Sequence, residues 1–401
     1  MCEKTLQQDV LYAIINIDRM VDDMLKRYTV SNFKSFKETT VFDFEKTNYQ
    51  MLSDSNTNGK ILKGVLFVGA NASGKSNSIM AIKFLLDSLL GKKEVDFNAQ
   101  CCVFAKRPVM KLKYEFEIDG AEIIYEIEYL LIDKLLKETL LVDNKKVFWR
   151  EGSYAEVAIT EHSIHKDVPG STLFLRDIYF NTKFRGNAAL QNWFVFLKNS
   201  VYVDLYSKNV LPYKDAHLSL KAYLDKNGTN EINDFFRRFN FEQSIEYDTQ
   251  AKGQWLQIES SDKMIFFKRK GVEEPMPYLY ESLGNRTLLT LLPAFFYCIK
   301  NKGMLLLDEF SSGFHNDLEE LLIRFFMRSA NGSQIIFVSH STNLLSTSLL
   351  RPDQIYSVEF NAEGSQIKRF SSEKPREAQN LEKMYLSGVF NGVPRYESAD
   401  Q

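Results

Sequence analysis

Runs that alternate apolar and polar residues occupy much of the first half of the chain. They cover residues 28–36, 40–44, 111–118 and 123–131, and Asp119-Gly120 separates the last two runs. Alternation of this kind is typical of strands with one buried face, and Asp-Gly between two such runs favours a hairpin turn. Residues 136–148 predict another strand pair around Asp143-Asn144. Together these runs predict an antiparallel sheet.

Apolar residues at helical spacing mark two other regions. Residues 1–26 predict an amphipathic helix, and residues 182 to about 241 predict a compact group of helices without the sustained heptads of a coiled-coil arm. Strand-like runs resume at 254–258 and 264–268. The apolar face of the first helix would consist of Leu6, Val10, Ala13, Ile14, Ile17, Met20, Val21 and Met24.

Three nearly continuous apolar runs differ from both patterns. They cover residues 63–68, 304–307 and 334–338, and each ends in residues that can carry chemistry. Runs of this length without alternation predict strands that are buried on both faces. Their order predicts a largely parallel sheet flanked by helices, with the antiparallel sheet and the helical group inserted between the first and second runs.

The first of these runs leads into a phosphate-binding pattern, G-x-x-x-x-G-K-S/T, which is followed by apolar residues at helical spacing. Strand, glycine loop and helix are the context in which backbone amides surround a polyphosphate at a helix N-terminus. Lys75 would reach the outer phosphates, and the Ser76 hydroxyl would join the Mg²⁺ ligands. The predicted nucleotide-binding residues are Gly69, Ala70, Asn71, Ala72, Ser73, Gly74, Lys75, Ser76 and Asn77.

The other two runs end in acidic residues and in a histidine. Asp308 would hold Mg²⁺ at the carboxyl end of its strand, and Glu309 would act as general base on the attacking water. His340 would contact the γ-phosphate and help to place that water. Acidic residues at strand ends also occur by chance, and a single histidine there is usually structural. The preceding phosphate loop favours the catalytic interpretation.

A second helix start, at residues 282–286, combines Ser282, Gly284, Asn285 and a basic residue. Serine and glycine at a helix N-terminus, followed by a basic residue, can bind an anion. Because the chain already has a phosphate loop, we expect this second site to serve the nucleotide of another subunit. The alternative interpretation is a simple helix cap made by Ser282 or Asn285.

Composition and net charge limit the kinds of partner that we expect this protein to bind. The chain has 401 residues and a net charge of −2, which excludes a globally basic nucleic-acid binder but allows a local basic face. The four cysteines show no metal-ligand spacing. Charged residues interrupt the N-terminal segment, and no run reaches the length of a membrane span. We therefore expect a cytoplasmic protein with no membrane partner.

The set of motifs and their order resemble the ABC-type ATPases of the SMC/RecF/OLD group. Residues 32–36 are similar to the first strand of that group, and Gln100 is a candidate for the Q-loop glutamine. The motifs that carry the resemblance are 69–76 (Walker A), 282–286 (a divergent signature), 305–309 (Walker B), 311–315 (D-loop) and His340 (switch histidine).

A narrower resemblance is to the RloA-like, OLD-related ATP-binding proteins of bacterial defence loci, at residues 350–355 and 385–394. The signature departs from the usual pattern, since Gly284-Asn285 replaces a Gly-Thr or Gly-Gly pair. The resemblance implies ATP and Mg²⁺ as cofactors. It also implies a homodimer or higher oligomer in which two heads enclose two ATP molecules and Ser282 and Gly284 reach across.

We expect an ABC-ATPase head of the α/β class, a mostly parallel sheet flanked by helices with an antiparallel β subdomain and an inserted helical lobe. The expected function is a slow, regulatory ATPase that acts as sensor of an antiphage system and controls a separately encoded effector, for which a nuclease is one candidate. A RecF-like DNA-binding ATPase of repair or replication is the alternative, and the long insertion disfavours a transporter subunit. The expected boundaries are 1–27 for the N-terminal helix, 28–180 and 251–401 for the two parts of the head, and 181–250 for the helical lobe.

Overall fold

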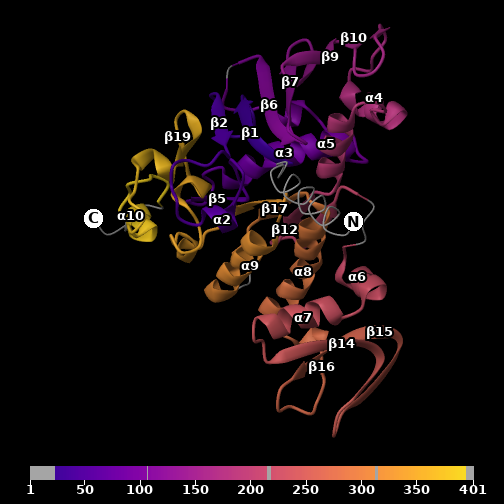
Figure 1. The fold of residues 1–401 in the computed structure, drawn as a ribbon, viewed down its shortest axis with the longest axis vertical. Helices are drawn as coiled ribbons and strands as arrows, with labels where there is room; N and C mark the ends of the chain where they lie inside the picture. Colours follow the sequence, from indigo (N-terminus) through magenta and orange to yellow (C-terminus); the bar gives the residue numbers. More distant parts are fainter. Residues whose placement is uncertain (1–22, 106, 215–217, 312–314, 394–401) are drawn as a thin grey trace, which may run out of the picture.

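The computed structural model describes residues 23–105, 107–214, 218–311 and 315–393. Two large sheets dominate it, and a smaller hairpin layer lies at one end, beyond helices α6 and α7 (Figure 1). The fold is of the α/β class, with a mostly parallel sheet flanked by helices and an antiparallel β subdomain, which confirms the predicted fold class. Among the described helices, none combines the length and the apolar content that crossing a lipid bilayer requires.

The first sheet is antiparallel throughout, in the order β11-β10-β9-β8-β7-β6-β1-β2. The hairpins predicted around Asp119-Gly120 and Asp143-Asn144 are its β6–β7 and β8–β9 turns. Its strands are β1 (Met24–Ser31), β2 (Thr40–Asp43), β6 (Val109–Ile118), β7 (Ala121–Leu130), β8 (Leu135–Val142), β9 (Lys145–Glu151), β10 (Tyr154–Val157) and β11 (Ser163–His165).

The second sheet has a parallel centre and antiparallel edges, in the order β13-β12-β17-β18-β5-β19-β20. The three continuous apolar runs form β5, β17 and β18, which confirms the predicted parallel sheet. Its strands are β5 (Gly64–Gly69), β12 (Val201–Asp204), β13 (Asn209–Pro212), β17 (Met304–Asp308), β18 (Gln334–Val338), β19 (Ile355–Asn361) and β20 (Gly364–Arg369).

Helices cover both faces of this second sheet. Helix α3 lies between the two sheets with α4 and α5 beside it, and α8 and α9 cover the opposite face (Figure 1). The helices are α2 (Ser53–Asn56), α3 (Lys75–Leu90), α4 (Phe174–Thr182), α5 (Ala188–Lys198), α6 (Leu220–Asn227), α7 (Asn230–Arg238), α8 (Leu283–Asn301), α9 (Asn316–Ser329) and α10 (Leu381–Leu386).

Smaller elements complete the described chain. The strand-like run predicted at 264–268 lies within one long strand, β15, which pairs with β14 and β16. The run predicted at 254–258 is mostly wrong, because only residues 257–258 belong to β15 and residues 254–256 lie in the connection from β14. The remaining elements are β3 (Thr57–Asn58), β4 (Ile61–Leu62), β14 (Gln243–Lys252), β15 (Gln257–Arg269), β16 (Met276–Pro277) and the 3₁₀ turns at Asn98–Gln100, Tyr278–Tyr280, Thr342–Leu344, Pro352–Gln354 and Phe370–Glu373.

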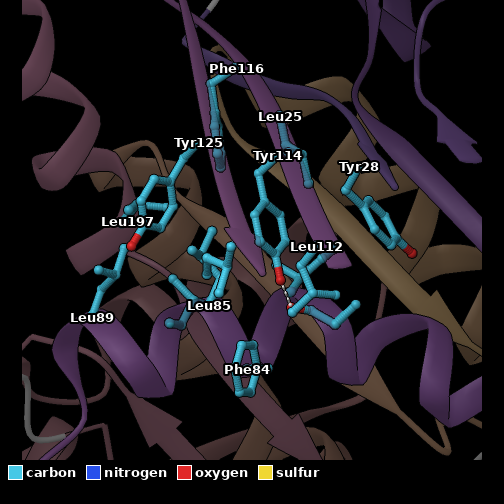
Figure 2. Packing of buried hydrophobic residues seen from close by; sticks show 14 of the residues in the cluster. Leu25, Tyr28, Phe84, Leu85, Leu89, Leu112, Tyr114, Phe116, Tyr125 and Leu197 are labelled. Atoms are coloured by element: carbon cyan, nitrogen blue, oxygen red, sulfur yellow. Dashed lines mark hydrogen bonds between the residues drawn. The ribbon is translucent and has the colours of Figure 1, made fainter. Parts of the chain in front are cut away.

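Apolar packing against α3 fixes the helix that carries the phosphate loop. Figure 2 shows the rings of Tyr114 and Tyr125 projecting from the antiparallel sheet towards Leu85 and Leu89 of α3. The Tyr114 hydroxyl donates to the Ala81 carbonyl at 2.7 Å, so this buried polar group is satisfied. Complete burial of one large apolar side chain, such as Leu85 or Leu89, contributes roughly 1.5–3 kcal/mol to the free energy of unfolding. This packing holds α3, and with it the end of the phosphate loop, in a fixed position against the antiparallel sheet.

Two predicted regions need correction. The N-terminal helix falls mostly outside the described residues, but its predicted end is wrong because Met24–Ser31 is strand β1, paired with both β2 and β6. The lobe predicted at 181–250 does contain α5, α6 and α7, yet its β12 is a strand of the second sheet beside β17. In both cases pairing with neighbouring strands overrides a local helical pattern.

Candidate functional site

The phosphate loop connects β5 to α3 and requires glycine at two positions. A Cβ on Gly69 would lie 2.2 Å from the carbonyl oxygen of Val358, and Gly69 has φ of +156°. Gly74 has φ of +102°, and its Cβ would lie 2.2 Å from Oγ of Ser365. Ala72 also has a left-handed backbone, with φ of 61°. The loop is thus tightly curved and closely packed on its outer side.

Helix α3 begins at Lys75 without a side-chain cap, because its N-cap residue is Gly74. The first amides of an α-helix lack partners within the helix, and the helix dipole adds positive potential there. This helix start can therefore receive an anion such as phosphate.

Lys75 brings a cation to the same place. Its side chain is buried, and its Nζ donates to the Ala70 carbonyl at 2.7 Å. Burial lowers the pKa of Lys75 to about 8, against the opposing influence of Glu309 and Asp308. A bound phosphate would stabilise the charged form of Lys75 further and could replace the Ala70 carbonyl as its partner.

Ser76 and Asp308 meet although they lie 232 positions apart in the chain. The Ser76 hydroxyl donates to Oδ1 of Asp308 at 2.8 Å, and the Tyr202 hydroxyl donates to Oδ2 at 3.4 Å. Burial raises the pKa of Asp308, while the hydrogen bond from Ser76 lowers it. A buried carboxylate beside a hydroxyl presents oxygen ligands, which Mg²⁺ prefers.

These two residues fit the magnesium site that the sequence predicts. Mg²⁺ usually takes one or two protein ligands and completes its coordination with water and substrate phosphates. In the described residues, no group of three or more His, Cys, Asp or Glu side chains could hold a metal by itself. Ser76 and Asp308 therefore suit a Mg²⁺ ion that binds together with a nucleotide.

Glu309 and His340 form the far side of the site. Oε2 of Glu309 lies 3.5 Å from Nε2 of His340, and the His340 amide donates to the Ser311 hydroxyl at 3.2 Å. Burial and then the charge of Lys75 lower the pKa of His340, although Glu309 opposes both effects. Glu309 has φ of 55°, a strained conformation of the kind found at functional sites.

One open cleft of about 1020 Å³ joins these groups. Asn71, Ala72, Gly74, Lys75, Ser76, Asn77, Asp308, Glu309 and His340 all line it. Gly69, Ala70 and Ser73 belong to the same loop but are not lining residues of the cleft. The structure therefore brings most of the predicted Walker A, Walker B and switch residues to one place.

Asp204 and Tyr206 also line the cleft, and sequence analysis missed both. Asp204 ends β12 directly beside Asp308, with which it is in register. It accepts hydrogen bonds from the amides of Tyr206 and Ser207, which fixes the turn after the strand. The sequence does contain a signal for Asp204, because residues 201–204 are an apolar run that ends in an acidic residue, as residues 304–308 are.

The predicted signature residues lie elsewhere. None of Ser282, Gly284 and Asn285 lines the cleft. The Ser282 hydroxyl accepts from the Asn285 amide at 3.2 Å and caps α8, and the Asn285 side chain bonds that of Gln243. Within one chain these residues thus make the predicted helix cap. Gln100 is also absent from the cleft lining, and its side chain donates to the Asp96 carbonyl.

The predicted D-loop is described only at its two ends. Ser311 contacts the His340 amide, and His315 is the N-cap residue of α9. Residues 312–314 lie outside the described residues.

The fold and this site define the class, an α/β domain with a phosphate loop and a cleft suited to a nucleotide. The chain belongs to the family described as "AAA domain, putative AbiEii toxin, Type IV TA system", whose model matches residues 65–346. That segment contains the phosphate loop, Asp308, Glu309 and His340. The RloA-like and OLD-related assignment stays a prediction.

Solved structures with similarity to this chain include heads of SMC proteins. The SMC head domain from Thermotoga maritima is 17% identical, with a TM-score of 0.47, over 86% of this chain and 97% of that chain. An SMC head bound to the C-terminal winged-helix domain of ScpA is 14% identical, with a TM-score of 0.49, over 86% and 96% of the two chains. A Pyrococcus furiosus SMC head with an extended coiled coil is 13% identical, with a TM-score of 0.46, over 87% and 97%. No curated protein matches the chain significantly.

Proposed function

We propose that this chain binds and hydrolyses ATP and acts as a switch that dimerises around the nucleotide. The proposal rests on two contacting pairs of side chains that line one cleft. The Ser76 hydroxyl lies 2.8 Å from Oδ1 of Asp308, and Oε2 of Glu309 lies 3.5 Å from Nε2 of His340. Lys75 lies at the start of α3 between them. This combination provides phosphate binding, metal ligands and a general base together.

Each residue has a role that its surroundings support. The open start of α3 and the Lys75 ammonium would bind the phosphates, and Ser76 and Asp308 would hold Mg²⁺. The Mg²⁺ ion, when bound, neutralises charge that develops on the phosphate oxygens. Glu309 would accept a proton from water as that water attacks the γ-phosphate and ADP leaves. His340, whose pKa is lowered by burial, would stay largely neutral and orient the water or the phosphate.

The position of the signature supports a site shared between two copies. Ser282 is exposed at the start of α8, away from the cleft lining of its own chain. If Ser282 and Gly284 contact ATP, a second copy must supply them. We therefore propose a homodimer that closes on two ATP molecules and opens after hydrolysis.

We further propose that the switch belongs to an antiphage defence system and controls a separately encoded effector. The description of the family names a toxin of a type IV toxin–antitoxin system, which is compatible with a chain that works beside a second gene product. We assign the effector activity to another protein, and a nuclease, TOPRIM or reverse-transcriptase gene beside this one would support that assignment.

Basic residues cluster in the sequence at 106–113, 183–185, 237–238 and 268–270. These basic clusters give little support to the alternative of a DNA-binding ATPase. Most of their described members already have partners in the chain, and Lys183 lies over the rings of Tyr179 and Phe180. The ion pairs are Arg107–Glu38, Lys111–Glu128, Lys113–Glu115, Arg237–Asp234, Lys268–Glu246 and Arg269–Glu281. DNA binding whose affinity falls steeply with salt would favour the alternative nonetheless.

The variant Glu309→Gln tests the proposed function. It should still bind ATP, lose about 100-fold or more of its turnover, and accumulate as an ATP-bound dimer, because it retains shape but not basicity. Phosphate release and size-exclusion chromatography with ATP measure the two effects. Glu320→Gln on α9 is the matched control, since Glu320 pairs with Arg324 and does not line the cleft. Unchanged turnover in Glu309→Gln would remove Glu309 as the base.

A further inference from the structure

The outer side of the phosphate loop is held by the last described segment of the chain. The Ala70 amide donates to the Gly392 carbonyl at 2.9 Å. The Tyr385 hydroxyl donates to the same carbonyl, also at 2.9 Å. We call residues 385–393 the C-terminal clasp. The clasp joins the end of the head to the first residues of the loop.

A second contact holds the other end of the loop. The Ser365 hydroxyl donates to the Ser73 carbonyl at 2.7 Å and shares a hydrogen bond of 2.7 Å with the Ser35 hydroxyl. The Asn77 side chain donates to the Ser35 hydroxyl at 2.8 Å. Ser365 comes from β20, so the loop is fixed by two elements that follow His340 in the chain.

The backbone around these contacts is packed too closely for larger residues. Val358 lies between the loop and the clasp, and a Cβ on Gly69 would lie 2.2 Å from its carbonyl oxygen. A Cβ on Gly392, where φ is +72°, would lie 3.0 Å from the same oxygen. The clasp, β19 and the loop therefore form one closely packed set of backbones.

The clasp also determines which loop amides can serve a ligand. The Ala70 amide is occupied by Gly392, whereas the amides of Asn71, Ala72 and Gly74 donate to no acceptor among the described residues. Those three amides, together with the start of α3, are the donors left for phosphate. A loop held at Ala70 and Ser73 presents them in a fixed arrangement.

We propose that Tyr385 and Ser365 are positioning residues of the nucleotide site, which hold the phosphate loop at Ala70 and Ser73 in the form that binds phosphate. The proposal rests on the proposed function, since it assumes that the loop binds ATP. It assigns a role to the C-terminal clasp that goes beyond completing the fold. Neither residue touches the nucleotide, so each acts through the loop.

One hydrogen bond of the clasp can be removed by a substitution that keeps the surrounding packing. The Tyr385 ring stacks on Phe370, which in turn stacks on Phe390 with centroids 3.7 Å apart. Tyr385→Phe keeps this ring stack and removes only the hydroxyl that reaches Gly392. Ser365→Ala removes the second contact. Tyr247→Phe and Ser372→Ala remove comparable hydrogen bonds that lie outside the loop and the clasp.

The experiment measures the Kd for ATP, the steady-state KM and kcat, and the melting temperature of the full chain. Tyr385→Phe and Ser365→Ala should each raise the Kd and KM about 5-fold, the usual effect of one hydrogen bond, and the double variant should exceed both. The kcat at saturating ATP should stay within about twofold, because Glu309 and His340 lie on other strands. The two control variants should bind ATP like the unaltered chain.

The possible outcomes separate this inference from the proposed function. If the unaltered chain binds ATP and Lys75→Ala does not, an unchanged Kd in Tyr385→Phe, Ser365→Ala and the double variant overturns the inference alone. A lower melting temperature with unchanged KM also overturns it, since the contacts would then be purely structural. If the unaltered chain does not bind ATP, the proposed function fails and this inference fails with it.

Discussion

Helices α3 and α8 both begin with a motif that the sequence assigns to phosphate binding, yet their first turns differ. At α3 the N-cap is Gly74, no side chain caps the helix, and Lys75 and Ser76 point into the cleft. At α8 the Ser282 side chain caps the helix by accepting from the Asn285 amide. One helix start is open to an anion, and the other is closed by its own chain.

The charged residues at the two helix starts also differ, Lys75 as the first residue of α3 and Glu281 just before the N-cap residue of α8. Glu281 is buried, accepts from the Ser282 amide and pairs with Arg269 through both carboxylate oxygens. Burial alone would raise the pKa of Glu281, but the bonds from Ser282, Asn285 and Arg269 together lower it. A negative charge is thus fixed beside α8, while α3 carries a lysine. We infer that α3 can bind phosphate unaided and that α8 needs a partner's nucleotide to complete its site.

Removing the cation at α3 should have the largest effect. Lys75→Ala should weaken ATP binding by about 3 kcal/mol, roughly 100-fold, because a buried charge-assisted contact to phosphate is lost. Isothermal titration calorimetry on the monomer measures this change. Lys145→Ala, an exposed lysine on β9, should bind ATP like the unaltered chain. An undiminished affinity in Lys75→Ala would end the phosphate-loop assignment and the contrast between the helices.

A third helix start, that of α9, carries two acids in its first turn, Asp317 and Glu319. Glu319 is 1% exposed, and burial raises its pKa to about 7 despite a hydrogen bond from Ser341. The folded pKa is above the ordinary value of 4.5, so the protonated form is stabilised in the folded protein. Folding stability should therefore fall as pH rises from about 4.5 to 7 and stay low above it, by on the order of 3 kcal/mol.

Glu319→Gln should remove this pH dependence. The variant should melt at a higher temperature than the unaltered chain at pH 8, and the two should converge near pH 5. Scanning calorimetry across this range measures the difference. Parallel profiles for Glu319→Gln and the unaltered chain would show that the carboxyl does not titrate in this range.

Sequence analysis found α3, Asp308 and His340 because each lies at the end of a local pattern that needs no distant partner to be recognised. It missed Asp204 because β12 is only four residues long, between helices, and becomes a strand by pairing with β17 more than 100 positions away. It extended the first helix through Met24 for the related reason that β1 depends on β2 and β6. The burial of Glu319 likewise depends on tertiary packing. The contact that we propose between α8 and a nucleotide would depend on a second copy of the chain, so no local pattern can establish it.

Blocking α8 should act on the dimer and leave binding to the monomer intact. Ser282→Arg places a long cation at the exposed helix start and should weaken ATP-dependent dimerisation at least tenfold, about 1.4 kcal/mol. Sedimentation with Glu309→Gln as background, to retain ATP, measures the dimer. Ser219→Arg is a matched control, because Ser219 caps α6 in the same way. A Ser282→Arg chain that dimerises normally would leave α8 as a structural helix only.

The smallest expected effect separates the cap of α8 from its proposed contact with ATP. Ser282→Ala removes the cap and should cost about 1 kcal/mol of stability, whereas Ser282→Asp retains a side chain that caps equally well. The aspartate would nevertheless place a second negative charge beside Glu281, where the γ-phosphate of the partner's nucleotide should arrive. Melting temperature should therefore fall in the alanine variant, and ATP-dependent dimerisation should fall most in the aspartate variant. If melting temperature and ATP-dependent dimerisation fall together in both variants, Ser282 affects dimerisation only through the helix cap. That result would contradict the proposed difference between the open start of α3 and the capped start of α8.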